Sequence, residues 1–456
     1  MSTYAGGFAP LRLHTAPGVL SVAPAVGAAA EAALRRARSV ELVRLSHGVT
    51  VHGDMSGDFG AAYPGDTPRP DLTAVGVAAA LEAAGVAVHV RDENATGGPM
   101  PPAAGVDVRL LKVQLATWRA DLDAAAEMRR ADPATPVVMY GATLSHVDAD
   151  RSWVVLGDAT RALADLYGSR DLAIGKAYRL FPLDRYRDEH GRLRAHLQAS
   201  RGCDRTCLYC PYIRVHGRWS ARSLDGLRED VAALAAVRVE AIQFRDQDFA
   251  SDGEHAVAAA AAVAEGGGGR IAFSVEGNLD RFTHDVVARL AEAGCAEVIV
   301  GIESVDPVVL RTARRRVLGD TPERIAAVKR AGVPVRGLFM VGLPGDDWDR
   351  VLATVTTAID LNLDGAQFNV YSPLPGERFG NAEVTRAEDF VPNSNNFRYR
   401  TCDAMTAMEV RLAAAWATQA FAAGRAGSAD AAGYLGRIAA RAEARRVPAG
   451  IAPAPA

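Results

Sequence analysis

Short apolar runs alternate with alanine-rich amphipathic segments from about residue 40 onward. Strands that alternate with helices of this length predict a parallel sheet with helices on both faces. We therefore expect a doubly wound, Rossmann-like α/β domain over residues 1–170. The predicted strands of this domain are 40–45, 86–90, 106–113, 136–140 and 154–156, and the predicted helices are 71–84, 121–130 and 159–167.

The same alternation resumes after a segment with prolines and many charges at 171–196, which we interpret as a linker. A strand before Cys203 and five later ones predict a partial (β/α)6 barrel over residues 197–380. Helices near 405–424 and 429–446 predict a helical extension over 381–456, with a disordered Pro/Ala tail after residue 447. The five later strands are 241–244, 271–275, 296–302, 335–341 and 366–371.

The composition is that of an ordinary soluble protein, with 49% hydrophobic and 23% charged residues among 456. The formal net charge of −3 calls for neither a nucleic-acid nor a membrane partner. Residues 1–26 lack the basic segment and continuous apolar stretch expected of a signal peptide, and no run of eighteen apolar residues occurs, so we expect neither export nor a membrane span. Since the five cysteines include three in one loop that must stay reduced to bind metal, we expect a cytoplasmic protein.

Three of the cysteines, Cys203, Cys207 and Cys210, are close enough in sequence to indicate a soft-metal site. Structural zinc takes four ligands, and no second CxxC or HxxxH occurs in the chain. A [4Fe-4S] cluster also takes four, but one iron can bind a small molecule instead of a protein ligand. A disulfide or buried free thiols are the alternatives, although three cysteines cannot pair evenly. We expect Arg201, Arg205 and Arg214 around the loop to favour the thiolates.

The CxxxCxxC spacing, with Tyr209 directly before the last cysteine, resembles the cluster loop of the radical S-adenosylmethionine (radical SAM) superfamily. The resemblance implies that SAM chelates the open iron and is cleaved to a 5′-deoxyadenosyl radical. The order of elements before the loop resembles the cobalamin-binding-type domain of one radical SAM subfamily. Because any Rossmann-like module would show this periodicity and no DxHxxG motif is present, cobalamin is possible but not favoured.

Residues at the carboxyl ends of the predicted barrel strands are candidates for cofactor binding, because these ends form the active face of parallel barrels. Gly301-Ile-Glu-Ser304 and Gly342-Leu-Pro-Gly345 resemble SAM-binding segments of the superfamily, and 373–376 resembles its closing loop. A plain structural turn is the alternative for the second segment. The expected cofactor-binding residues are Tyr209, Ser274, Gly301, Glu303, Gly342, Pro344 and Gly345.

Three carboxylates near two adjacent strand ends, Asp246, Asp248 and Glu276, are the predicted catalytic residues. Carboxylates bind ammonium groups and transfer protons, so these suit a cationic, hydroxyl-rich substrate. A pair of helix-capping residues is the alternative for Asp246 and Asp248.

The length and layout also resemble the radical SAM diol dehydratases of aminoglycoside antibiotic biosynthesis. That resemblance implies a lyase that dehydrates an amino sugar such as paromamine, served by a flavodoxin- or ferredoxin-type electron donor and a partner dehydrogenase. Two other functions remain open, namely a cobalamin-dependent radical SAM methyltransferase and a noncatalytic iron-sulfur electron carrier. A carrier needs no SAM contacts at successive strand ends, which argues against it.

Overall fold

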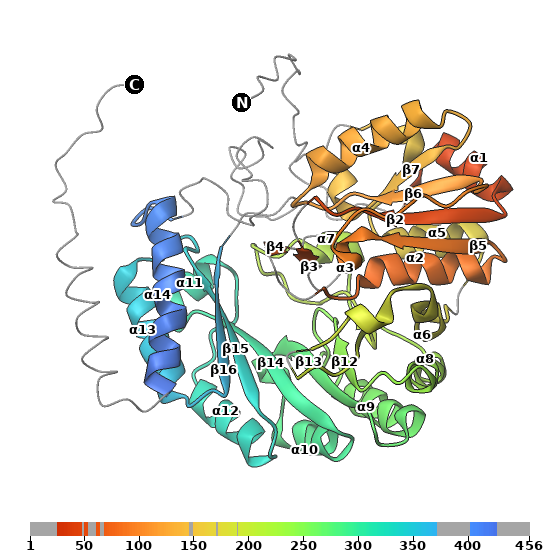
Figure 1. The fold of residues 1–456 in the computed structure, drawn as a ribbon. Coiled ribbons are helices and arrows are strands. Elements are labelled where there is room, and N and C mark those ends of the chain that lie inside the picture. Colours follow the sequence, from red (N-terminus) through yellow and green to blue (C-terminus); the bar gives the residue numbers. More distant parts are fainter. Residues whose placement is uncertain are drawn as a thin grey trace, which may run out of the picture.

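The computed structural model describes residues 25–47, 50–52, 61–63, 68–145, 149–169, 172–188, 190–371 and 402–425. These residues form two six-stranded sheets and two short two-stranded ones (Figure 1). The predicted loop at 373–376, the predicted helix at 429–446 and the predicted tail lie outside the described residues. None of the described helices is long and apolar enough to cross a membrane.

The N-terminal sheet has five parallel strands in the order β5-β2-β6-β7-β8, as the alternation of apolar and polar segments predicted. A two-residue strand, β1, pairs antiparallel with β8 at one edge and is too short to leave an apolar run in the sequence. The strands are β1 (Ala25–Val26), β2 (Ser39–Arg44), β5 (Ala87–Asp92), β6 (Val108–Lys112), β7 (Val137–Tyr140) and β8 (Val154–Leu156). A separate pair, β3 (Thr50–His52) and β4 (Ala61–Tyr63), is antiparallel.

Helices cover both faces of this sheet because successive strand residues point to opposite sides. Leu42 and Leu110 pack on the side of α1, α2 and α5, whereas Val43 and Leu111 pack on the side of α4. The helices are α1 (Ala28–Arg36), α2 (Leu72–Ala83), α3 (Glu93–Thr96), α4 (Trp118–Ala131) and α5 (Ala159–Tyr167).

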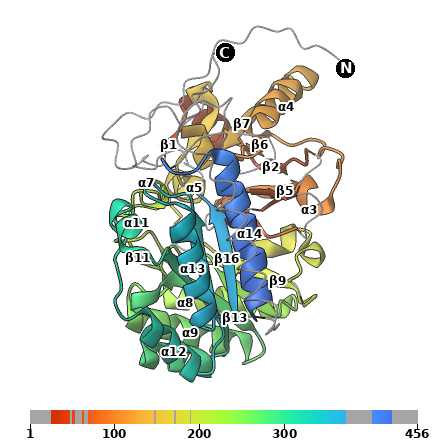
Figure 2. The same ribbon diagram turned by 90° about the vertical axis from the view of Figure 1, so that its left-hand side faces the viewer.

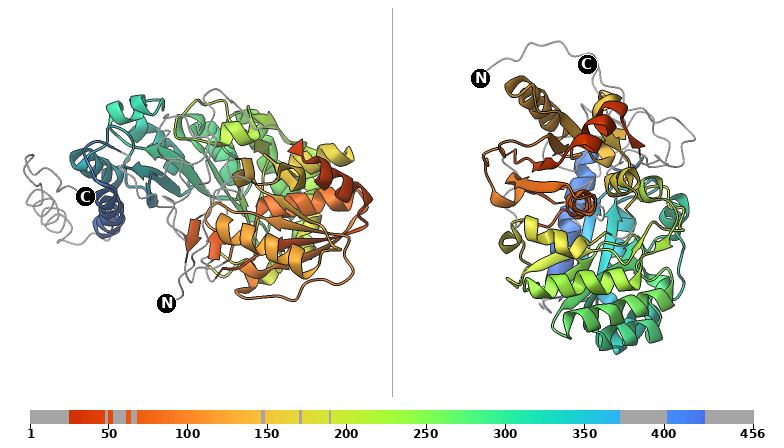
Figure 3. Two further views of the ribbon diagram at one scale, coloured as in Figure 1. Left: turned by 90° about the horizontal axis from the view of Figure 1, so that it is seen from above. Right: turned by 90° about the vertical axis from the view of Figure 1, so that its right-hand side faces the viewer.

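The N-terminal domain and the barrel share one continuous hydrophobic core. Residues 72–81 of α2 are all buried, because α2 contacts α5 on one side and α6 (Ile174–Ala177) on another, and α6 packs on α8. Gly175 of α6 has no room for a side chain, since an added Cβ would lie 2.2 Å from the Asp230 carbonyl oxygen. Figures 1 and 3 show the two domains side by side along this seam.

The second sheet is an open parallel barrel in the order β9-β12-β13-β14-β15-β16, which confirms the predicted α/β fold class. The first strand begins at Arg194, inside the segment expected as a linker. The strands are β9 (Arg194–Leu197), β12 (Ala241–Phe244), β13 (Ala272–Asn278), β14 (Cys295–Glu303), β15 (Val335–Val341) and β16 (Gly365–Val370).

The two faces of the barrel sheet differ in polarity. Along β13, Phe273 and Val275 are buried, while Ser274 and Glu276 alternate with them on the less covered inner face. Aromatic residues such as Phe244 and Phe273 pack edge to face beneath the outer helices. Those helices are α8 (Leu224–Ala236), α9 (Gly253–Gly267), α10 (His284–Glu292), α11 (Pro307–Thr312), α12 (Thr321–Arg330) and α13 (Trp348–Asp360).

The last described helix, α14 (Ala407–Arg425), packs against α13 and the final strand β16 (Figure 2). Trp416 meets Trp348 of α13 with ring centroids 6.2 Å apart, and Phe421 meets Phe368 of β16 at the same separation. The helical C-terminal region therefore covers one edge of the open barrel.

Candidate functional site

The cysteine loop begins directly after β10 (Ser200–Arg201), which pairs with β11 (Ser220–Ala221), and leads into α7 (Tyr212–His216). Gly202 adopts a φ of 78°, and a Cβ there would lie 2.3 Å from the Arg218 carbonyl oxygen, so only glycine fits. The Leu208 N–H donates to the Ala313 carbonyl at 3.0 Å. The loop is thus tied to the segment that follows α11.

All three cysteines of the loop are free thiols, and Cys203 and Cys207 are buried. Within the described ranges, no three His, Cys, Asp or Glu side chains converge as a metal site. Burial raises the pKa of Cys203 to about 11 and that of Cys210 to about 12. Because iron binds thiolates, loading a cluster must deprotonate and gather them. Three free thiols in one loop fit a [4Fe-4S] cluster by donor chemistry.

The arginines that contact the cysteines differ in part from those predicted. The Arg205 backbone N–H donates to Cys203 Sγ at 3.4 Å, and Arg315 Nη1 donates to Cys207 Sγ at 3.8 Å. Arg201 instead pairs with Asp158, and the side chain of Arg214 lies outside the described part. Arg315 was missed by sequence reasoning, although the run Arg314-Arg-Arg316 marks its position.

Two of the predicted SAM-binding residues meet beside the loop. The Tyr209 hydroxyl donates to Glu303 Oε1 at 2.9 Å, and Arg315 Nη2 lies 3.7 Å from the same oxygen. Burial raises the pKa of both Glu303 and Tyr209. Glu303 ends β14 with a φ of 67°, a left-handed conformation that side chains disfavour and that tends to occur at functional sites.

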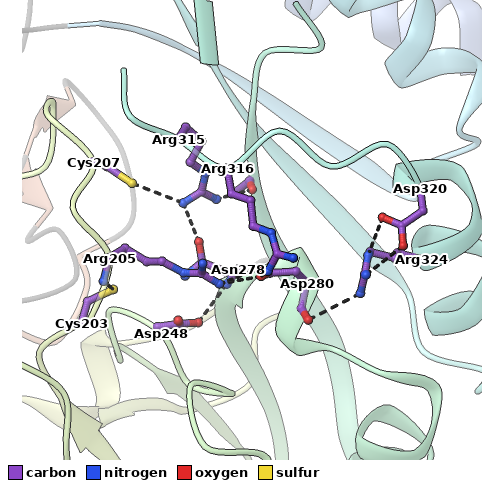
Figure 4. Close-up of polar contacts among 11 residues, drawn as sticks. Cys203, Arg205, Cys207, Asp248, Asn278, Asp280, Arg315, Arg316, Asp320 and Arg324 are labelled. Atoms are coloured by element: carbon purple, nitrogen blue, oxygen red, sulfur yellow. Dashed lines mark hydrogen bonds and ion pairs between the residues drawn. The ribbon is translucent and has the colours of Figure 1, made fainter. Parts of the chain in front are cut away.

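Arg315 connects this group to the neighbouring strand ends (Figure 4). Its Nη1 donates to Asn278 Oδ1 at 2.5 Å, and its Nη2 donates to the Gly301 carbonyl at 2.6 Å. One guanidinium therefore touches the ends of β13 and β14, the carboxylate of Glu303 and a cysteine of the loop.

Asp248 presents an unsatisfied oxygen on the other side of Asn278. Its Oδ1 accepts the Asn278 N–H at 3.0 Å, whereas its buried Oδ2 has no hydrogen-bond partner in the described structure. Burial raises the pKa of Asp248, and its charge contributes to the raised pKa of Cys203. An acceptor without a partner next to a cysteine of the loop is a site for a donor such as an ammonium group.

The other two predicted catalytic carboxylates have different surroundings. Asp246 is fully buried and accepts hydrogen bonds from the Ala199 N–H at 3.2 Å and from the N–H and hydroxyl of Ser200 at 2.5 and 2.6 Å. It therefore anchors the strand that leads into the cysteine loop. Glu276 lies on the inner face of the barrel, 3.9 Å from Arg245, next to Ser274 on the same face.

The Gly342–Gly345 turn has positive φ at both glycines, 92° and 89°, with Pro344 between them. Asp346, which sequence reasoning missed, accepts the Gly342 N–H at 2.8 Å and fixes the turn. Leu343 packs with Tyr371, and Tyr209 and Met340 lie against the same small apolar cluster. The tyrosine of the cysteine loop thus joins the turn that was predicted to bind SAM.

A cavity of about 600 Å³ adjoins these residues. Cys207, Asn278 and Gly301 line one part of it, and the segment from Arg311 to Leu318 lines another. Arg315 belongs both to this lining and to the group around Glu303, so the cavity and the predicted SAM residues share a boundary.

The N-terminal domain reaches the cysteine loop through Asp158. Its carboxylate caps α5 by accepting the Arg161 N–H at 3.0 Å, and it also binds Arg201 at 2.6 Å and His216 at 3.2 Å. The Arg201 guanidinium and these hydrogen bonds hold the pKa of Asp158 well below its usual range despite burial. Because Arg201 precedes the loop and His216 ends α7, both ends of the loop segment are attached to the N-terminal domain.

The crevice at the carboxyl ends of β2, β5 and β6 is where sheets of this strand order bind ligands. Here Lys112 Nζ lies 2.6 Å from both oxygens of Asp71, and the Tyr186 hydroxyl donates to Asp92 at 2.6 Å. Arg44 lies 3.5 Å from both carboxylates. All five side chains are 2% exposed or less. In the described part of the crevice these side chains pair with one another and are buried.

The comparisons with known proteins agree with the geometry of the loop and strand ends. Residues 197–358 match the radical SAM superfamily. The matched residues cover most of the barrel, from the last residue of β9 into α13. Radical SAM domains use a [4Fe-4S] cluster and SAM, the two cofactors that were predicted.

Among curated proteins, an uncharacterized methyltransferase of Pyrococcus horikoshii is 30% identical over 233 residues, 50% of this chain and 49% of that protein. A tRNA-2-methylthio-N(6)-dimethylallyladenosine synthase of Deinococcus radiodurans is 27% identical over 201 residues, 41% of this chain and 40% of that protein. The chain thus spans about half the length, or less, of these relatives.

Among solved structures, the radical SAM methyltransferase TsrM of Kitasatospora setae, with tryptophan and a SAM analogue bound, superposes with a TM-score of 0.53 at 17% identity. The match covers 73% of each chain. The cobalamin-dependent radical SAM enzyme OxsB superposes with a TM-score of 0.50 at 14% identity, covering 83% of this chain and 60% of OxsB. At these identities the likeness concerns the fold, and it extends over both domains. The comparisons give no support to dehydration of an aminoglycoside.

Proposed function

We propose that the chain is a radical SAM enzyme that abstracts a hydrogen atom from a small polar substrate. When bound, the cluster and SAM supply a 5′-deoxyadenosyl radical. The observation that carries the proposal is that Tyr209, Glu303 and Arg315 gather beside the cysteine loop, with Asp248 on the other side of Asn278 from Arg315. An electron carrier would need none of these groups.

The charges around the loop complement the ends of SAM. The unpaired Oδ2 of Asp248 would accept hydrogen bonds from the SAM ammonium, and the Arg315 guanidinium would bind its carboxylate. Glu303 is placed to accept from a ribose hydroxyl, and the apolar group of Tyr209, Leu343 and Tyr371 suits the adenine ring. This arrangement orients the sulfonium toward the loop, which is the contribution that the protein makes to the reaction.

The inner face of the barrel supports a polar substrate. Ser274, Glu276 and Arg336 alternate with buried apolar residues on their strands, and Arg245 lies 3.9 Å from Glu276. Side chains that donate and accept hydrogen bonds in this lining suit a molecule with hydroxyl or ammonium groups and disfavour an apolar one. Glu276 and Asp248 are the carboxylates that we propose for contact with substrate or SAM, whereas the contacts of Asp246 support an anchoring role.

Two outcomes can follow hydrogen abstraction. The names of the relatives favour methyl transfer over dehydration. The buried, paired side chains in the crevice of the N-terminal domain are the specific observation that favours a reaction without cobalamin, such as dehydration of an amino sugar. Because the chain covers only part of the curated relatives, both outcomes are proposals, and mass spectrometry of the product separates them.

The test is anaerobic incubation of reconstituted protein with SAM, dithionite and candidate amino sugars. We expect 5′-deoxyadenosine from the native protein and from Cys295→Ala, a buried cysteine at the start of β14, but none from Cys203→Ala. A loss of water identifies a dehydratase and a gained methylene identifies a methyltransferase. Bound corrin after reconstitution with cobalamin would contradict the proposal that the N-terminal crevice favours a reaction without cobalamin. Equal deoxyadenosine from Cys203→Ala would refute the radical SAM assignment of the loop.

A further inference from the structure

Three successive arginines follow α11, and they differ sharply in exposure. Arg315 is largely buried against Cys207, whereas Arg314 and Arg316 are exposed. The backbone turns at Arg314, whose φ of 51° is unfavourable for a residue with a Cβ. The turn is held on both sides, because the Arg315 N–H donates to the Leu310 carbonyl at 2.8 Å and the Ala313 carbonyl accepts from Leu208 of the cysteine loop.

This arginine turn gives the cavity a strongly positive lining. Its lining includes five arginines and two aspartates, although the whole chain has a formal net charge of −3. Asp280 is already bound by Arg205 at 2.6 Å and by Arg316 at 2.7 Å. Arg311 and Arg314 are exposed and have no acidic partner among the described residues. An anionic partner would therefore find uncompensated charge at this face.

The positive face also lies next to a predicted ligand of the cluster. Cys207 lines the same cavity and is 5% exposed, and Arg315 Nη1 is 3.8 Å from its sulfur. A protein that docks on Arg311, Arg314 and Arg316 would place its own redox group close to the cysteine loop. Short separation is what electron transfer between two proteins requires, and charge complementarity speeds their encounter.

We propose that Arg311, Arg314 and Arg316 form the docking face for an acidic, low-potential one-electron donor protein of the flavodoxin type. The inference rests on the proposed function. It adds the surface through which the electron for SAM cleavage reaches the cluster. One electron leaves the reduced flavin of the donor and passes to the cluster on the cysteine side. It is then consumed when the C5′–S bond of SAM breaks to give methionine and the deoxyadenosyl radical.

RNA is the other polyanion that such a face could bind, and some relatives carry the name of tRNA-modifying enzymes. Recognition of a nucleic acid rests on many phosphate contacts along an extended basic surface. The excess charge described here is confined to one cavity rim on a chain that is acidic overall. The observations therefore favour a small acidic protein.

The test compares Arg311→Glu/Arg314→Glu with Arg270→Glu/Arg289→Glu, a control with the same charge change at exposed positions outside this face. The probe is a bacterial flavodoxin, fully reduced, and the measurement is the stopped-flow rate of cluster bleaching at low and high salt. We expect at least a tenfold slower rate for the first variant at low salt, a small difference at high salt, and a native rate for the control. Dithionite-driven deoxyadenosine formation should match the native protein in both variants.

Three results would overturn the docking face. Bleaching of Arg311→Glu/Arg314→Glu at the native rate would show that flavodoxin docks elsewhere. An equal loss of dithionite-driven activity would place these arginines in SAM binding. Tighter binding of an RNA oligonucleotide than of flavodoxin, abolished by the same variant, would identify an RNA surface. If the native protein forms no deoxyadenosine with dithionite, the proposed function fails, while the bleaching rates still test docking.

Discussion

Replacing Arg315 with Gln tests whether one buried guanidinium holds the candidate site together. Its side chain is 13% exposed and bridges Asn278, Gly301 and Cys207, with Glu303 3.7 Å away. In Arg315→Gln, Glu303 stays buried with the Tyr209 hydroxyl as its remaining hydrogen-bond donor among the described residues. Removing one member of a buried ion pair costs about 3–5 kcal/mol. Because the distance between the two charged groups is long for an ion pair, we expect the lower end of this range, a fall of about 3 kcal/mol in the free energy of unfolding.

The assay is urea unfolding of the metal-free, reduced protein, followed by circular dichroism. Arg311→Gln is the matched control, since it removes the same charge from an exposed side chain and should change the stability by less than about 0.5 kcal/mol. Glu303→Gln combined with Arg315→Gln should recover part of the loss, because neither buried charge then remains unpaired. A loss below about 0.5 kcal/mol for Arg315→Gln, or strict additivity in the double variant, would refute the reasoning.

Glu303→Gln alone should keep the cluster but weaken SAM binding by roughly 1–3 kcal/mol, the range for a hydrogen bond to a charged group, and unchanged affinity in calorimetry would remove Glu303 from the site. Burial raises the pKa of Asp246 to about 7, so its folded state holds a proton that the unfolded chain releases near pH 4. Its contribution to stability should therefore decline as pH rises from about 4 to 7, and Asp246→Asn should show a smaller decline in urea unfolding; identical pH profiles would contradict this. Asp158→Asn should weaken the attachment of Arg201 and His216, so proteolysis within 201–216 should be faster than in the native protein, whereas Asp165→Asn on the exposed face of α5 should cleave at the native rate.

The sequence alone was sufficient for the parallel strands of the two large sheets, the fold class and the cysteine loop, because each depends on residues close together in the chain. Apolar runs such as 335–341 form the buried strand β15 with the predicted bounds. The spacing of Cys203, Cys207 and Cys210 gave the resemblance to the radical SAM superfamily in the same way, and residues 197–358 match that superfamily. Strand β1 was missed because its two residues are held by pairing with β8 and carry no local signal.

Tertiary structure decided which residues share the site, because those contacts join segments far apart in sequence. Arg315 lies 108 residues from Cys207, and Asp158 lies 43 residues from Arg201, so no local pattern pairs them. Asp246 follows a strand end as predicted. Its carboxylate nevertheless accepts a hydrogen bond from the backbone N–H of Ser200, just before the cysteine loop. The charged residues of the N-terminal crevice look like ordinary polar strand ends in the sequence. Only the packing of the domains buries them.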